Sequence, residues 1–142
     1  MTSRIFIGLN EDCIFIRQKV FVEEQGFSDE FDETDNEAFH LLIYKDEAPI
    51  ATARMFWNDN RTALIVGRVA VLEEEREHNV GSMIMELLER KAIEESCEKI
   101  ELSAQLRVQG FYEKQGYKAS GEQYYDQHCP HIHMEKIIIR RS

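Results

Sequence analysis

The sequence predicts an α/β fold, a layered α+β architecture in which helices cover a mixed β-sheet. Segments rich in β-branched and aromatic residues are separated by turn signals, and two longer segments carry apolar residues at helical spacing. Their order along the chain is strand, helix, three strands, helix, strand, short helix and two strands. Alternation of this kind is typical of a sheet with helices packed against it.

The first half of the chain is predicted to contain one helix and most of the strands. Asn10 is a suitable N-cap for an amphipathic helix over about residues 11–25, and Gly26 is expected to end it. A turn is expected at residues 46–49, where D-E-A-P interrupts the strand pattern. Strands are expected over residues 1–8, 38–44, 50–57 and 63–72, of which the last is the longest β-branched run.

The second half is predicted to contain two helices and three strands. A helix over residues 80–96 has a stripe of apolar side chains that would pack on a sheet, formed by Val80, Met83, Ile84, Leu87, Leu88 and Ala92. A short helix over residues 108–115 is expected to end at Gly116. Strands are expected over residues 100–104, from residue 117 onward, and over residues 131–139.

Length and composition indicate one globular domain, residues 1–142. No apolar run approaches the roughly 18 residues that a membrane span needs, so no membrane association is expected. The three cysteines, Cys13, Cys97 and Cys129, are odd in number and widely spaced, which favours free thiols in a reducing compartment. We therefore expect a cytoplasmic protein.

The acidic charge of the chain is concentrated in one segment. The net charge is −10, and eight acidic residues lie between Lys19 and Lys45 with no lysine or arginine among them: Glu23, Glu24, Asp29, Glu30, Asp32, Glu33, Asp35 and Glu37. Such a balance repels polyanions, so nucleic-acid binding is not expected. The segment is either a solvated loop or a surface that attracts cationic amines.

Residues 69–82 form the junction that is most informative for function, because a buried strand, a tight loop and a helix start follow one another there. Backbone N–H groups at a helix start lack intrahelical partners and lie at the positive end of the helix dipole, so they can hold a pyrophosphate. Gly81 allows close approach, and Asn79 tolerates a positive φ, so the loop can form an anion-binding nest. The alternative is an ordinary connection that contains a glycine.

This junction resembles the pyrophosphate loop of the GNAT N-acetyltransferases. Arg76 to Gly81, R-E-H-N-V-G, is similar to the pattern (Gln/Arg)-x-x-Gly-x-(Gly/Ala), with Asn79 in place of the middle glycine. Further similarity lies in V-A-V at 69–71, F-Y-E-K-Q-G-Y at 111–117 and V-F-V-E-E-Q-G at 20–26. The last segment and P-H-I-H-M-E-K at 130–136 resemble a branch of small stand-alone bacterial GNAT proteins, which is related to glyphosate-type N-acetyltransferases.

The resemblance implies a twisted, mostly antiparallel sheet of about seven strands with helices on both faces. It also implies transfer of an acetyl group from acetyl-CoA to a small amine, amino acid-like or polyamine-like, by direct transfer in a ternary complex. The residues implied in acetyl-CoA binding are Val69, Ala70, Val71, Arg76, Glu77, His78, Asn79, Val80, Gly81 and Ser82. The strand residues among them would pair with the pantetheine arm through their backbone, and the Val71 N–H would polarise the thioester carbonyl.

Three residues are candidates for proton transfer. Tyr112 matches the family tyrosine that protonates the departing thiolate, a role that suits a phenol with a reference pKa of about 10. His131, on the last strand, is the first candidate for the base that deprotonates the amine, because histidine side chains titrate close to neutral pH. Glu24, in the segment that borders the acceptor site of the family, is the second, and a chain of water molecules is the alternative to both.

Two other groups of residues have alternative interpretations. Arg54 and Arg68, on neighbouring predicted strands, either clamp a carboxylate of the acceptor or pair with nearby acidic residues. Cys129, His131 and His133 alternate onto one strand face, but no second ligand cluster is visible in the sequence, so no metal is expected.

Other functions stay open at this point. A GNAT fold can serve as a non-catalytic sensor of acyl-CoA, and an acidic border near residues 29–37 would suit an acetyltransferase that acts on basic peptides. The sequence does not distinguish a monomer from a homodimer.

Overall fold

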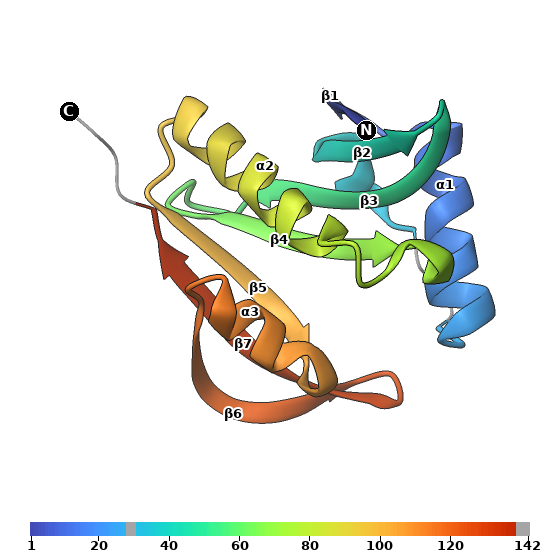
Figure 1. Cartoon of the computed structure of the whole chain (residues 1–142). Coiled ribbons are helices and arrows are strands. Elements are labelled where there is room, and N and C mark those ends of the chain that lie inside the picture. Colours follow the sequence, from blue (N-terminus) through green and yellow to red (C-terminus); the bar gives the residue numbers. More distant parts are fainter. Residues whose placement is uncertain (28–30, 139–142) are drawn as a thin grey trace. The chain divides into compact units, whose positions relative to one another are not determined.

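A seven-stranded, mostly antiparallel sheet is the framework of the protein in the computed structural model, which describes residues 1–27 and 31–138 (Figure 1). The strands are β1 (Thr2–Ile7), β2 (Phe39–Lys45), β3 (Ala48–Trp57), β4 (Leu64–Val71), β5 (Lys99–Gln105), β6 (Lys118–Asp126) and β7 (Cys129–Ile137). Their order in the sheet is β1-β2-β3-β4-β5-β7-β6. The β4–β5 pair is parallel, and the β1–β2, β2–β3, β5–β7 and β6–β7 pairs are antiparallel. The predicted fold class is confirmed.

The helices occur in the predicted order: α1 (Glu11–Arg17), α2 (Val80–Glu94) and α3 (Gln109–Lys114). The Asn10 side chain accepts a hydrogen bond from the Cys13 N–H at 3.0 Å, so the predicted N-cap is confirmed. The prediction of a single α-helix over residues 11–25 is wrong in one respect. The helix is α-helical only to Arg17 and continues as a π-helix over Gln18–Glu24. No residue pattern marks this change, which only shifts hydrogen-bond acceptors by one residue, as in the 3.1 Å bond from Gln25 N to Val20 O.

Some boundaries differ from the predictions. The β2–β3 turn is shorter than expected, because Asp46 and Glu47 both have positive φ and allow β3 to begin at Ala48. Among the described residues there are also three short 3₁₀ turns, Glu33–Asn36, Glu73–Glu75 and Leu106–Val108, which the sequence analysis did not predict. Asp29, Glu30 and Ile139 belong to segments predicted from the sequence, but they lie outside the described residues.

The described chain divides into two compact units. The first comprises residues 1–27, 31–56 and 67–88, and the second residues 57–66 and 89–138. In the first unit the consecutive residues Leu41, Leu42 and Ile43 are all fully buried, so β2 is covered on both faces. A single domain over the whole chain stays a prediction.

A network of buried charges connects α1, the segment after residue 30 and β3 within the first unit. Arg17, which is only 1% exposed, donates two hydrogen bonds to the Asp35 carboxylate at 2.7 and 3.1 Å. Arg54 donates to the same carboxylate at 3.0 Å. Burial disfavours the charged form of Asp35, but the hydrogen bonds from Arg17 and from the Asp32 backbone outweigh it and lower the pKa of Asp35.

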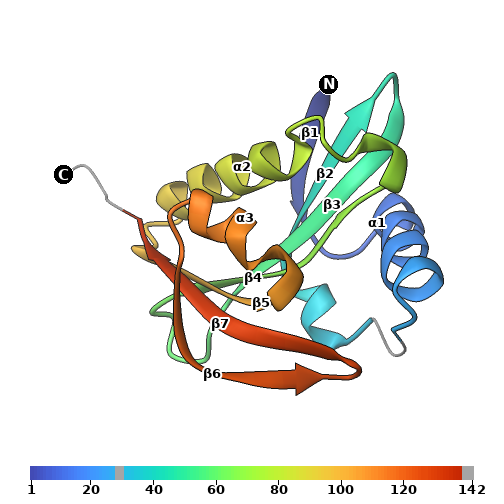
Figure 2. The same ribbon diagram turned by 60° about the horizontal axis from the view of Figure 1, so that its bottom comes forward.

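In the second unit, β7 lies between β5 and β6, and α3 packs beside β5 and β6 (Figure 2). Ile100, Leu102 and Met134 are buried, whereas every residue of β6 is exposed. The second unit therefore has its core around β5 and β7, with β6 as an edge strand. Among the described residues, no helix is both long and apolar enough to span a membrane.

We expect Asp35→Asn to destabilise the protein by about 3–5 kcal/mol, because it removes the buried carboxylate to which both the Arg17 and the Arg54 guanidinium groups donate. Urea denaturation at pH 7 measures this loss. Since the folded-state pKa of Asp35 lies below the unfolded value of about 3.9, its stabilisation is complete above that pH and is lost on further acidification. The difference between wild type and variant should therefore shrink in acid. Glu23→Gln, which removes the exposed pair with Lys19, is the control and should change stability by less than about 0.5 kcal/mol.

Candidate active site

The loop between β4 and α2 has the geometry of an anion-binding nest. Glu77 and Asn79 have φ values of 70° and 61°, and His78 between them does not have a positive φ. The prediction that Asn79 adopts a left-handed conformation is therefore confirmed. The Asn79 carbonyl accepts the hydrogen bond from Met83 N at 3.1 Å, so the N–H groups of Val80, Gly81 and Ser82 belong to the first turn of a fifteen-residue helix. N–H groups in the first turn of a helix lie at the positive end of its dipole and can face an anion.

Arg76 fastens this loop to two other elements of the first unit. Its Nε donates to the Val71 carbonyl at 2.9 Å, and its two terminal nitrogens donate to the Glu24 carboxylate at 2.6 and 2.7 Å. These hydrogen bonds from Arg76 to Glu24 raise the pKa of Arg76. The structure thus joins two residues that the sequence analysis treated separately. Both oxygens of Glu24 thus accept hydrogen bonds from a guanidinium group.

The end of β4 carries the three residues that were expected to pair with the pantetheine arm. Ala70 is buried, whereas Val69 and Val71 are partly exposed. Arg68, immediately before them, has a φ of 52°. A left-handed residue inside a strand is typical of a bulge, which locally interrupts the regular ladder.

Arg54 and Arg68 meet on one carboxylate. Arg54 donates to Asp32 at 2.6 and 3.1 Å, and Arg68 donates to the same side chain at 3.4 Å. The hydrogen bonds from Arg54 lower the pKa of Asp32, so this carboxylate is charged at neutral pH. The sequence left two partners open for these arginines, a carboxylate of the acceptor or nearby acidic residues. The structure contains the second arrangement, with Asp32 as the partner.

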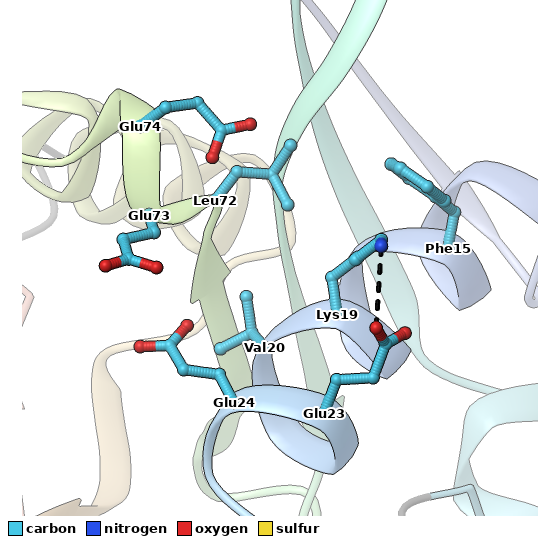
Figure 3. A pocket seen from close by; sticks show the side chains of 8 residues that line it. All are labelled: Phe15, Lys19, Val20, Glu23, Glu24, Leu72, Glu73 and Glu74. Atoms are coloured by element: carbon cyan, nitrogen blue, oxygen red, sulfur yellow. Dashed lines mark hydrogen bonds and ion pairs between the residues drawn. The ribbon is translucent and has the colours of Figure 1, made fainter.

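A cavity of about 370 Å³ lies within the first unit, next to the turn that follows β4 (Figure 3). Four glutamates line it with one lysine and three apolar side chains: Phe15, Lys19, Val20, Glu23, Glu24, Leu72, Glu73 and Glu74. Lys19 pairs with Glu23 at 3.4 Å. The wall is therefore negatively charged overall, and sequence analysis missed the contribution of Glu73 and Glu74, which come from the unpredicted 3₁₀ turn.

Tyr112 lies on α3 in the second unit and is 8% exposed. Burial raises the pKa of its phenol to about 12. Its ring contacts those of Phe111 and Tyr117 edge-on, with centroids 5.0 and 6.1 Å away. A buried phenol with so high a pKa keeps its proton at neutral pH.

His131 lies on β7 in the same unit, and the structure determines its tautomer. Its Nδ1 is 3.0 Å from the Cys129 carbonyl oxygen, which can only accept, so Nδ1 carries the proton. In the neutral form of the ring Nε2 therefore carries the lone pair, and within the described residues no protein group bonds to it. The ring also stacks on Tyr124, with centroids 6.1 Å apart.

The side chains that could hold a metal differ from those considered in the sequence. Glu101, His133 and Glu135 offer ligand atoms within 4.8 Å of one another, whereas His131 is bound to the Cys129 backbone. Lys99 lies 3.5 Å from the Glu101 carboxylate and 3.2 Å from that of Glu135. Within these described residues, a lysine thus already neutralises part of the negative charge.

Sequence analysis also gave no role to Lys136, although the P-H-x-x-M-x-K segment contains it. Lys136 donates at 2.8 Å to both the Glu89 carboxylate and the Gln115 carbonyl. The motif was the available signal, but a lysine in a motif does not reveal which groups it contacts.

Comparison with known proteins gives a consistent result. The profile of the family described as "Acetyltransferase (GNAT) domain" matches residues 15–138. The chain is 34% identical to the uncharacterized N-acetyltransferase YjcF of Bacillus subtilis over 129 residues, which is 89% of this chain and 91% of that protein. The crystal structure of Escherichia coli ElaA is similar with a TM-score of 0.84 and 27% identity, covering 95% of this chain and 98% of ElaA. An acyl-CoA N-acyltransferase from Pseudomonas aeruginosa has the same TM-score at 25% identity, with 95% and 98% covered.

Proposed function

The chain belongs to the GNAT acetyltransferase family and is an acyltransferase, and on this basis we propose that it transfers an acetyl group from acetyl-CoA to a small cationic amine. The observation that carries the proposal is the left-handed pair Glu77 and Asn79 directly before α2. Three cysteines that are free in the structure support a reducing, cytoplasmic setting.

In this proposal the loop binds the pyrophosphate through backbone groups. The N–H groups of Val80, Gly81 and Ser82 donate to phosphate oxygens, and the positive end of the α2 dipole favours their charge. Arg76 cannot easily turn to the phosphates, because Glu24 and the Val71 carbonyl hold all three of its nitrogens. We therefore propose that Arg76 maintains the conformation of the loop and does not itself bind the phosphates. The backbone of Val69, Ala70 and Val71 pairs with the pantetheine arm.

His131 is the proposed base. Its protonated Nδ1 is fixed on the Cys129 carbonyl, so the lone pair of Nε2 is the one that can accept the proton of an ammonium group. Glu24 is the weaker candidate, since Arg76 occupies both of its oxygens. The neutral amine then attacks the thioester carbonyl carbon in a ternary complex, the C–N bond forms and the C–S bond breaks.

Tyr112 is the proposed acid. The departing CoA thiolate takes the phenolic proton. The nitrogen loses its second proton as the amide forms, and this proton restores the phenol, while the first passes from His131 to solvent. Because burial raises its pKa to about 12, Tyr112 is fully protonated before each turnover. A thiolate in a buried setting is a stronger base than one in water, which favours transfer from such a phenol.

Two features support a polyamine-like acceptor over an amino acid-like one. Arg54 and Arg68, the candidate receptors for an acceptor carboxylate, already hold the carboxylate of Asp32. The cavity next to the β4–α2 loop is lined by four glutamates and one lysine, a charge that attracts cations. Release of free thiol from acetyl-CoA, measured with a panel of polyamines, amino acids, aminoglycosides and basic peptides, tests the choice. Amino acids that outperform every polyamine would contradict it.

Gly81→Glu should abolish stabilisation by acetyl-CoA, because it places a carboxylate where the pyrophosphate binds. Acetyl-CoA at about a hundred times its dissociation constant should stabilise the wild type by about 2.7 kcal/mol in a thermal unfolding assay. The variant itself should fold, since an acidic residue in the first turn suits the helix dipole. Asn79→Gly is the control and should keep binding, as glycine readily adopts the φ of 61° found there. A wild-type ligand shift in Gly81→Glu would remove the loop from the proposal.

His131→Asn should lower kcat/KM and remove the acidic limb of its pH profile, because asparagine cannot accept the proton of the amine. The same profile of Glu24→Gln should keep that limb. Loss of the limb in Glu24→Gln alone would make Glu24 the base. If both variants keep it, the amine loses its proton in solution and neither residue is the base.

Tyr112→Phe should reduce kcat by about 10²–10⁴-fold while acetyl-CoA binding stays close to wild type, because only the proton donor is removed. Single-turnover measurements ensure that chemistry limits the rate. An unchanged rate would show that Tyr112 is a packing residue.

A further inference from the structure

The helix that carries Tyr112 depends on contacts at its C-terminal end. With six residues, α3 is far below the length at which an isolated helix is stable, so the second unit must hold it in place. Its end forms a Schellman motif: Gly116, with φ of 97°, donates to the Glu113 carbonyl, and Tyr117 N donates to the Tyr112 carbonyl, both at 3.0 Å. Tyr112 is therefore part of the motif that ends the helix.

Lys136 of β7 closes this motif from outside the helix. Its ammonium group donates to the Gln115 carbonyl, at the C-terminal end of the helix, at 2.8 Å. A cation at this point also interacts favourably with the negative end of the helix dipole. Space for the lysine depends on Gly116, because a Cβ there would lie 3.1 Å from Lys136 Cε.

The same ammonium group also holds Tyr117, whose ring contacts that of Tyr112. It donates to Glu89 of α2 at 2.8 Å, and the other oxygen of Glu89 accepts a hydrogen bond from the Tyr117 hydroxyl at 3.3 Å. Lys136 Nζ also lies 5.7 Å from the centroid of the Tyr117 ring. Tyr117 in turn contacts the Tyr112 ring edge-on and holds its backbone. Lys136 thus reaches Tyr112 through two routes, the helix end and the Tyr117 ring.

We propose that Lys136, together with Glu89, is the positioning residue for the Tyr112 hydroxyl. This inference rests on the proposed role of Tyr112 as the acid. Lys136 does not touch the reacting atoms in this scheme. It determines where the phenol lies, and displacement of a catalytic group by about 1 Å can cost about a hundredfold in rate.

The test is a double-mutant cycle in kcat with Lys136→Met and Tyr112→Phe, measured under single-turnover conditions. Lys136→Met alone should lower kcat by about tenfold or more and change the KM for acetyl-CoA by less than about twofold. In the Tyr112→Phe background it should lower kcat no further, because no phenolic proton remains to be positioned. Lys136→Arg, which keeps a cation at the helix end, should recover part of the loss.

Lys99→Met is the matched control, since Lys99 is a lysine of the same unit that pairs with two glutamates, and its kcat should equal that of the wild type. Glu89→Gln gives a second approach if Lys136→Met does not fold, because the amide preserves size while weakening the bond to Lys136. The same cycle with Tyr112→Phe applies to it.

The outcomes separate the two proposals. Equal fractional losses of kcat in the wild-type and Tyr112→Phe backgrounds would overturn the positioning role while Tyr112 keeps its function. A wild-type kcat in Lys136→Met would do the same. A wild-type kcat in Tyr112→Phe would overturn both proposals.

Discussion

Asp35 keeps a negative charge inside the first unit, and the arrangement around it follows from the need to pair that charge. Arg17 of α1 and Arg54 of β3 both donate to its carboxylate, so a helix and a strand must converge on the short segment that carries Asp35. An unpaired charge at such a depth would cost several kcal/mol, so these three groups have to fold together. The terminal nitrogens of Arg54 also donate to Asp32, which accepts a further hydrogen bond from Arg68. These contacts give both arginines a carboxylate partner within the protein.

A second constraint is the backbone around the end of β4. Arg68, Glu77 and Asn79 are left-handed, a conformation that costs non-glycine residues energy and persists where surrounding contacts impose it. Arg76 supplies such contacts by linking the Val71 carbonyl to Glu24 at the end of the π-helix. These contacts within the protein hold the loop in its curled form from both sides. A preformed backbone site binds an anion without first having to order itself, which favours affinity.

In the second unit, burial keeps the proposed acid protonated, and one carbonyl orients the ring of the proposed base. Tyr112 retains its proton because a phenolate would be poorly solvated in its environment. His131 has its tautomer fixed by the Cys129 carbonyl of its own strand, so the nitrogen that can accept a proton is defined before substrate binds. The two residues need no mutual contact for these properties. The surroundings of each residue determine these properties separately. Lys136 adds a contact at the C-terminal end of α3, the helix that carries Tyr112.

The sequence by itself determined the order of strands and helices, the Asn10 cap, the end of α3 at Gly116 and the left-handed position of Asn79. All of these depend on neighbours within a few residues, through apolar periodicity, side-chain capping or backbone sterics. It also indicated the family, because the loop and the F-Y-E-K-Q-G-Y segment are local patterns. Only the tertiary structure decided that Arg54 and Arg68 bind Asp32, that Glu24 is held by Arg76, and that Lys136 reaches the end of α3. Each of these contacts joins residues at least 20 positions apart. Which partner a charged side chain selects depends on distances in the folded chain, and a local residue pattern carries no information about those distances.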